Sequence, residues 1–170
     1  MFFALRIAIV VLMLTEKELE MEKKDAINLN PLILAFVGDS TFENFVRERI
    51  IRRGTASLPH KLHIEAIRYV KAANQSYIME VIESLLSEEE AYIYKRGRNM
   101  KSMTVPKNAK VIDYRRATGF EALIGYLFLT GEEKRLNEIM ELSAKAIEER
   151  KDEAHRDMKG VNDNGQERRT

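Results

Sequence analysis

Two acidic residues of this 170-residue chain lie in segments so apolar that their charge needs a specific explanation. Asp39 follows Gly38 in the run PLILAFVGDSTFE (31–43), and Glu121 lies in the run ATGFEALIGYLFL (117–129). An unpaired carboxylate is costly to bury, and a bound cation is a standard way to offset that cost. The chain has no cysteine, so a metal held here would have hard oxygen ligands, which suit Mg²⁺ or Mn²⁺.

A second carboxylate accompanies the first of these acids. Asp39 and Glu43 are four residues apart, so they share one face of a helix. The residues alone leave two other interpretations open. The pair could be the polar edge of an ordinary amphipathic helix, or backbone amides, Arg115 or Arg116 could satisfy the buried carboxylates.

One segment of the chain is strongly basic although the net charge of the whole chain is only +1. Residues 95–110 contain no acidic side chain, and their basic residues are Lys95, Arg96, Arg98, Lys101, Lys107 and Lys110. Such a loop is either a solvated basic surface or a contact for the phosphates of a polyanion. A divalent metal beside a bound polyanion points to phosphodiester hydrolysis.

Helices must position these residues, because no stretch of useful length shows the alternation of a strand. The apolar spacing predicts helices over about 31–51, 60–86, 87–97, 113–129 and 132–150. The fold class is therefore predicted to be all-α.

Several helix ends carry recognisable signals. Asn30 is a good N-cap and Pro31 suits the first helical position. Gly54 and Gly131 are expected to end the helices that precede them, and Ser87 opens a capping box. Within the long helix over 60–86, the expected buried stripe is Leu62, Ala66, Tyr69, Val70, Ala73, Tyr77, Val81 and Leu85. Within the last helix it is Leu136, Ile139, Met140, Ser143 and Ile147.

The chain is expected to divide into three parts. Residues 1–24 form an apolar and charged extension whose apolar run is short for a membrane span and has no small-residue cleavage site. We interpret it as a mis-set start or a dispensable extension, in preference to a signal peptide or a membrane anchor. Residues 25–150 form the single globular domain, and residues 151–170 are expected to be a disordered polar tail.

Two acidic motifs and an ordered set of three blocks resemble a known family. Residues 34–43 (LAFVGDSTFE) resemble the signature helix of ribonuclease III domains, and residues 118–125 (TGFEALIG) resemble their second acidic motif. The segments KRGRNMK (95–101), TVPKN (104–108) and YRRATGFEALIGYL (114–127) are similar to Mini-ribonuclease III, which lacks a double-stranded RNA-binding domain. The resemblance covers about residues 29–148, and it implies a ribonuclease III-type helical endonuclease domain.

The resemblance also implies roles for individual residues. Asp39 and Glu121 match the catalytic metal ligands, with Mg²⁺ as the implied cofactor and Mn²⁺ as a substitute. Glu43 and Thr118 are expected to support these ligands without binding the metal directly. Full-length ribonuclease III domains have further acids where this chain has Leu32, Ala35 and Thr118, so water must complete the metal's coordination. The residues expected to bind RNA are Lys95, Arg96, Arg98, Lys101 and Lys107.

The implied partners are double-stranded RNA and a second copy of the chain. The family resemblance implies a cytoplasmic homodimer that cuts both strands of a duplex, leaves 5′-phosphate ends and acts on precursor 23S ribosomal RNA, with a ribosomal protein as a further candidate partner and no membrane. Two alternatives remain at this point. One is a non-catalytic helical dimer that binds structured RNA, and the other is a metal-dependent phosphohydrolase that acts on nucleotides.

Overall fold

The computed structural model describes residues 20–54, 58–100 and 110–166, with side chains to residue 150. Within those ranges every regular element is a helix, which confirms the all-α prediction. In chain order the helices are α2 (Lys23–Asn28), α3 (Pro31–Arg52), α4 (Pro59–Val70), α5 (Ala72–Ile82), η1 (Glu83–Leu85), α6 (Glu88–Arg98), α7 (Val111–Leu129) and α8 (Glu133–Gln166).

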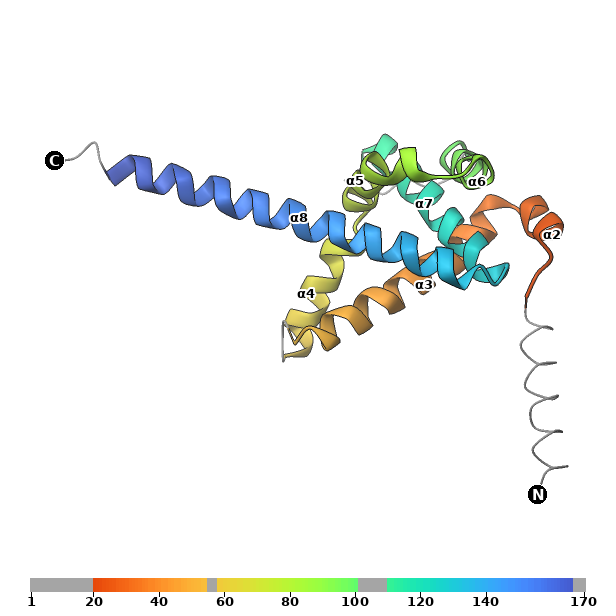
Figure 1. The fold of residues 1–170 in the computed structure, drawn as a ribbon, viewed down its shortest axis with the longest axis horizontal. Coiled ribbons are helices and arrows are strands. Elements are labelled where there is room, and N and C mark those ends of the chain that lie inside the picture. The colour runs from red at the N-terminus through yellow and green to blue at the C-terminus, as the bar shows by residue number, and fades with distance from the viewer. Residues whose placement is uncertain (1–19, 55–57, 101–109, 167–170) are drawn as a thin grey trace, which may run out of the picture.

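Helix α7 is the centre of the domain (Figure 1). It packs against α3, α5 and α6, and every residue from Ala117 to Leu127 is buried except Glu121, which is half-buried. A helix that is apolar around its whole circumference is stable only when other helices enclose it. The one acidic residue in this stretch is therefore held inside a helical core.

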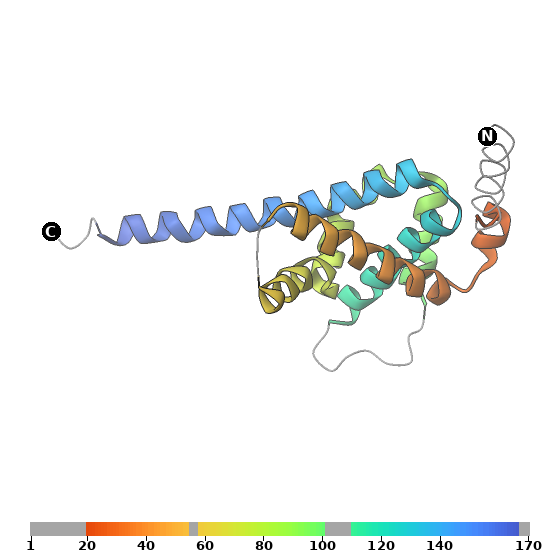
Figure 2. The same cartoon turned by 90° about the horizontal axis from the view of Figure 1, so that it is seen from below.

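Helices α3 and α7 cross with their backbones almost in contact (Figure 2). A Cβ atom added to Gly38 would lie 1.8 Å from the carbonyl oxygen of Glu121, and one added to Gly125 would lie 1.9 Å from the carbonyl oxygen of Leu34. No side chain fits at either position, so the two glycines set the distance between the helices. On both sides of the crossing, buried Leu34 and Phe42 fill the core, and the Phe42 ring meets Phe120 edge-on at 4.9 Å between centroids.

The predicted helix ends are confirmed. The Asn30 side chain accepts a hydrogen bond from the Leu32 amide at 2.9 Å, with Pro31 at the first helical position. Ser87 and Glu90 form the reciprocal capping box of α6. Gly54 and Gly131 have φ values of 63° and 67°, the left-handed conformation that suits glycine at a helix C-terminus.

The prediction of one long helix over residues 60–86 is wrong. The backbone is extended at Lys71 (ψ 134°), which separates α4 from α5, and the Asn74 side-chain amide donates to the Arg68 carbonyl at the end of α4. Neither Gly nor Pro marks this break in the sequence. The break rotates α5, so Val81 and Leu85 are exposed whereas the residues turned inward are Gln75, Ser76, Ile78, Met79 and Ile82.

Helix α8 presents the five residues predicted to face inward, and all of them are buried. The sequence predicts a disordered tail from Lys151, whereas α8 continues to Gln166 and extends beyond the other helices (Figures 1 and 2). Residues 151–158 contain no Gly or Pro and are mostly good helix formers, so local propensity favours continuation. Residues 1–19, which include most of the predicted extension, lie outside the described ranges. No helix in those ranges is long and apolar enough to cross a membrane.

Replacing Gly38 by alanine should destabilise the protein. Alanine gains about 1 kcal/mol of helix propensity over glycine. Against this, a methyl group 1.8 Å from a backbone oxygen forces α3 and α7 apart. Overpacking costs about 1–3 kcal/mol and occasionally more, and a backbone overlap this close belongs at the upper end of that range. We expect Gly38→Ala to lower the free energy of unfolding by about 2 kcal/mol or more in urea denaturation. Ser40→Ala, at an exposed position of the same helix, is the control, and equal stability of the two variants would contradict the account of the crossing.

Candidate active site

The helix crossing brings together two carboxylates that are 82 positions apart in the sequence. Asp39 follows the glycine of α3 that touches the backbone of Glu121 on α7, and the negative charge of Asp39 raises the pKa of Glu121. Asp39 is exposed and Glu121 is half-buried, so the pair lies at the surface end of the crossing, where a ligand can reach both.

The protonation of Glu121 is strongly perturbed. Burial, followed by the charge of Asp39, raises its pKa to about 8, while the side-chain amide of Gln75 acts in the opposite direction. Burial raises the pKa of Asp39 as well, and the nearby charge of Glu43 adds to this effect. Mutual repulsion between partly desolvated carboxylates is typical of a functional site and is relieved by a cation.

No lysine or arginine of the described ranges forms an ion pair with Asp39 or Glu121. Arg116, a candidate partner on sequence grounds, instead pairs with Glu80 at 2.5 Å. Within the same ranges no three His, Asp or Glu residues gather in a metal-binding arrangement. Two oxygen ligands suit Mg²⁺, which commonly binds proteins through one or two carboxylates and keeps several waters. The residues present therefore fit a hydrated Mg²⁺ ion or its analogue Mn²⁺.

Glu43 and Thr118 have local partners. Glu43 accepts a hydrogen bond from Arg47 at 2.6 Å, one turn further along α3. The Thr118 hydroxyl donates to the carbonyl of Tyr114 at 3.1 Å within α7. Glu43 influences Asp39 through its charge, whereas the hydrogen bond of the Thr118 hydroxyl goes to the backbone and to neither carboxylate. The supporting role of Thr118 stays a prediction.

The basic residues differ in what they contact. Lys95 is exposed on α6, and the guanidinium of Arg98 lies 5.5 Å from the centroid of the Tyr94 ring. Arg96 donates to the carbonyl oxygens of Ile27 and Leu29, so it fastens the segment before α3 to α6. Its guanidinium is therefore engaged in holding the fold. Lys101 and Lys107 lie outside the described residues.

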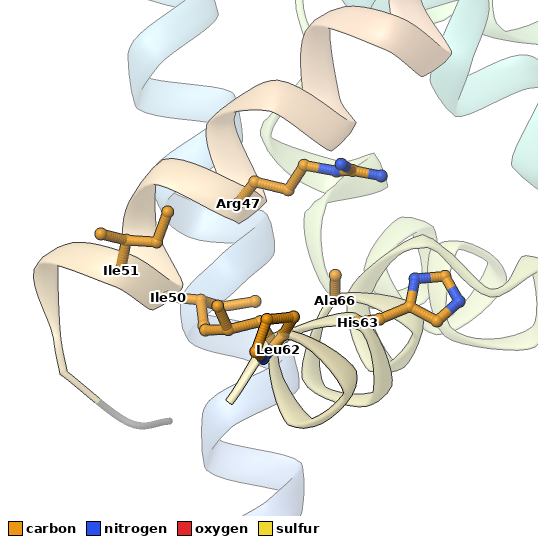
Figure 3. Close-up of a pocket in the computed structure, with 7 residues that line it drawn as sticks. Arg47, Ile50, Ile51, Leu62, His63 and Ala66 are labelled. Atoms are coloured by element: carbon orange, nitrogen blue, oxygen red, sulfur yellow. The ribbon is translucent and has the colours of Figure 1, made fainter. Parts of the chain in front are cut away.

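A separate pocket of about 240 Å³ lies between α3 and α4 and does not include either carboxylate (Figure 3). Ile50 of α3 and Leu62 of α4 line it, with Arg47 and His63 also at its edge. His60 and His63, at the start of α4, are both exposed.

Sequence reasoning missed Gln75. It is fully buried on α5, and its amide acts on the Glu121 carboxylate. A glutamine in the middle of a helix carries no signal by itself, and its inward orientation depends on the unforeseen break at Lys71.

Replacing Glu121 by glutamine should stabilise the metal-free protein at high pH. The pKa of Glu121 is about 8 in the folded protein against 4.5 in the unfolded reference, so wild-type stability falls as pH rises from about 4.5 to 8. Glutamine does not titrate, and each kcal/mol is worth about 2–4 °C in a chain of this size. In EDTA, the Tm advantage of Glu121→Gln over wild type should grow between pH 5 and pH 9. Glu149→Gln, at an exposed position of α8, is the control, and a pH-independent Tm difference for Glu121→Gln would contradict the burial of that carboxylate.

Comparisons with known proteins show which family the chain resembles. The family model described as "Ribonuclease III domain" matches residues 32–132. A Mini-ribonuclease 3 from Clostridium tetani is 48% identical over 130 residues, covering 76% of this chain and 86% of the relative. A Mini-ribonuclease 3 from Thermoanaerobacter sp. is 49% identical over 127 residues, covering 75% of this chain and 89% of the relative.

A solved structure has the same fold. The crystal structure of a protein from Fusobacterium nucleatum superposes with a TM-score of 0.62 at 31% identity, and the match covers 69% of this chain and 93% of that protein. The resemblance seen in the three sequence blocks is thereby confirmed, and the nuclease is favoured over the non-catalytic alternative. The chain belongs to the ribonuclease III domain family and is an endoribonuclease.

Proposed function

We propose that this endoribonuclease cuts double-stranded RNA with Mg²⁺ bound between Asp39 and Glu121. The observation that carries the proposal is the meeting of these two carboxylates at the glycine crossing of α3 and α7. Neither carboxylate has a cationic side chain as partner within the described structure. The pair is thus left free to bind a metal ion.

Each residue of the site has a distinct task in this proposal. Glu121 and Asp39 hold the ion. Glu121 must lose its proton to do so, and its raised pKa disfavours that loss at neutral pH. Glu43 keeps the local potential negative beside Asp39 and is itself held by Arg47. When bound, Mg²⁺ supplies water activation and stabilises the negative charge that develops on the phosphate.

Basic residues of α6 and of the segment that follows it in sequence are proposed to bind the RNA backbone. Lys95 is exposed, and Arg98 is fixed over Tyr94 at the end of the same helix. Lys101 and Lys107 follow in sequence and extend the positive charge. We leave Arg96 out of the phosphate contacts because its guanidinium is bonded to two backbone carbonyls. Duplex RNA would be recognised through its backbone and shape, as is usual for A-form helices.

A homodimer is proposed because the start of α3 presents an apolar surface. Phe36 is 78% exposed, and Ile33 and Leu32 lie beside it at 52% and 40% exposure. Exposed apolar side chains grouped in this way favour burial against another chain. Phe36 precedes Asp39 by three residues, so an interface there would set two catalytic centres close to one another.

We further propose that the substrate is the paired ends of precursor 23S ribosomal RNA in the cytoplasm, presented with or without a ribosomal protein. Support for this narrower assignment comes from the resemblance to Mini-ribonuclease III. The 5′-phosphate ends of the products follow from the same resemblance.

Removing either carboxylate should abolish cleavage. Asp39→Asn and Glu121→Gln each take away one of two metal ligands, and we expect the rate of duplex cleavage to fall at least 1,000-fold, or about 4 kcal/mol in activation free energy. The assay compares a duplex RNA with its single strands, in Mg²⁺ and in EDTA. Glu133→Gln, an exposed position at the start of α8, is the matched control and should cleave as wild type does. Cleavage that persists in EDTA or in either ligand variant would contradict the metal centre.

Removing positive charge from the basic segment (residues 95–110) should lower the affinity for RNA. It should also make that affinity less dependent on salt concentration. Lys95→Gln with Lys101→Gln removes two proposed phosphate contacts, so the slope of log Kd against log salt should fall by roughly 2. Binding is measured in the Asp39→Asn background, which prevents cleavage. Lys134→Gln with Lys145→Gln removes the same charge from exposed positions of α8 and should leave the slope unchanged. If both double variants lower the slope equally, the proposal that Lys95 and Lys101 contact the RNA phosphates is wrong.

A further inference from the structure

Gln75 is a buried polar side chain without a conventional partner. Its exposed fraction is 0%, and neither its Oε1 nor its Nε2 atom forms a hydrogen bond within the described structure. More than nine in ten buried polar groups in proteins are hydrogen-bonded, and leaving one unpaired costs about 1–3 kcal/mol. Two such atoms on one side chain therefore call for a specific explanation.

The position of Gln75 supplies that explanation. Helix α5 packs directly against α7, and the Gln75 amide is close enough to the Glu121 carboxylate to favour its ionised form without completing a hydrogen bond. The adjacent Ser76 is also buried with an unpaired hydroxyl, yet it has no such effect on Glu121. The amide of Gln75 is thus directed at the Glu121 carboxylate.

A carboxamide suits this location chemically. It offers two N–H donors and one oxygen acceptor, and it carries no charge that would compete with the ligands. A donor beside Glu121 fixes the orientation of an ionised carboxylate, and residues that orient metal ligands in this way commonly change metal affinity 10–100-fold when they are replaced.

We propose that Gln75 is a positioning residue of the catalytic centre, whose amide N–H donates to the Glu121 carboxylate and whose amide oxygen accepts a hydrogen bond from a water molecule at the same centre. The inference rests on the proposed function, because it assumes that Asp39 and Glu121 hold a divalent cation. Gln75 acts through Glu121 and does not touch the reacting atoms.

A purely structural role makes a different prediction. Leucine is close to glutamine in size and removes both unpaired polar atoms, so Gln75→Leu should be neutral or stabilising in the metal-free protein. If Gln75 positions Glu121, the same change weakens cation binding. Metal affinity then falls while stability is unchanged or higher. A packing defect would lower stability instead.

The test measures Mn²⁺ binding by electron paramagnetic resonance and Tm in EDTA for full-length wild type, Gln75→Leu and Ser76→Ala. We expect Gln75→Leu to bind Mn²⁺ about 10–100-fold more weakly with an unchanged or higher Tm, and Ser76→Ala to match wild type in affinity. The Mg²⁺ concentration for half-maximal cleavage of a duplex RNA should rise by the same factor, with cleavage recovering at high Mg²⁺.

Other results of these measurements would overturn the positioning role of Gln75. Wild-type Mn²⁺ affinity in Gln75→Leu overturns the inference and leaves the proposed function intact. If Gln75→Leu unfolds, Gln75→Met takes its place as a more flexible apolar substitute, and unfolding of both overturns the positioning role in favour of a structural one. Failure of wild type to bind Mn²⁺, or binding that survives in both Asp39→Asn and Glu121→Gln, overturns the proposed function and this inference together.

Discussion

The close approach of α3 and α7 at Gly38 and Gly125 is the constraint on which the rest of the structure depends. With Cβ positions less than 2 Å from carbonyl oxygens of the facing helix, the two backbones leave no room for any side chain between them. Asp39 and Glu121 lie directly at this contact, so the distance between two residues far apart in the sequence is set by main-chain atoms. Backbone contacts of this kind are stiffer than contacts between flexible side chains, which suits a site that must hold its geometry.

The same constraint makes the site unfavourable without a ligand. It places Glu121 in an apolar environment beside a second carboxylate, which raises the pKa of Glu121 to about 8. The packing of α5 on α7 adds to this, because it leaves the Gln75 amide buried without a complete hydrogen bond. A protein selected only for stability would carry apolar residues at these positions. Strain of this sort is characteristic of functional sites, where groups are arranged for a bound state and are poorly satisfied without it. One divalent cation would relieve the repulsion between the two carboxylates.

The sequence predicts the parts of this molecule that depend on local chemistry. Asn30, Gly54, Ser87 and Gly131 begin or end helices as expected, because capping depends on residues within one turn. The break at Lys71 could not be foreseen, since neither Gly nor Pro marks it and it depends on how α4 and α5 pack in the fold. That break decides which face of α5 is buried, and with it the position of Gln75.

In the candidate site, too, some features follow from the local sequence and others depend on long-range packing. Asp39 and Glu121 could be selected from the sequence because acids in apolar helices are conspicuous, and the family resemblance paired them before any geometry was known. Arg96 looked equivalent to its basic neighbours, but its bonds to the carbonyls of Ile27 and Leu29 depend on a long-range contact that no local pattern reports. Charge alone does not distinguish a residue that binds RNA from one that fastens a helix.

The most direct test of the account is the location of Mn²⁺ in crystals of the protein, determined by anomalous scattering at the manganese edge. The account predicts an anomalous peak bonded to carboxylate oxygens of both Asp39 and Glu121, at the surface end of the α3–α7 crossing. A peak that contacts only one of them, or Mn²⁺ bound elsewhere with these two carboxylates unliganded, would contradict the claim that the crossing exists to hold a shared metal.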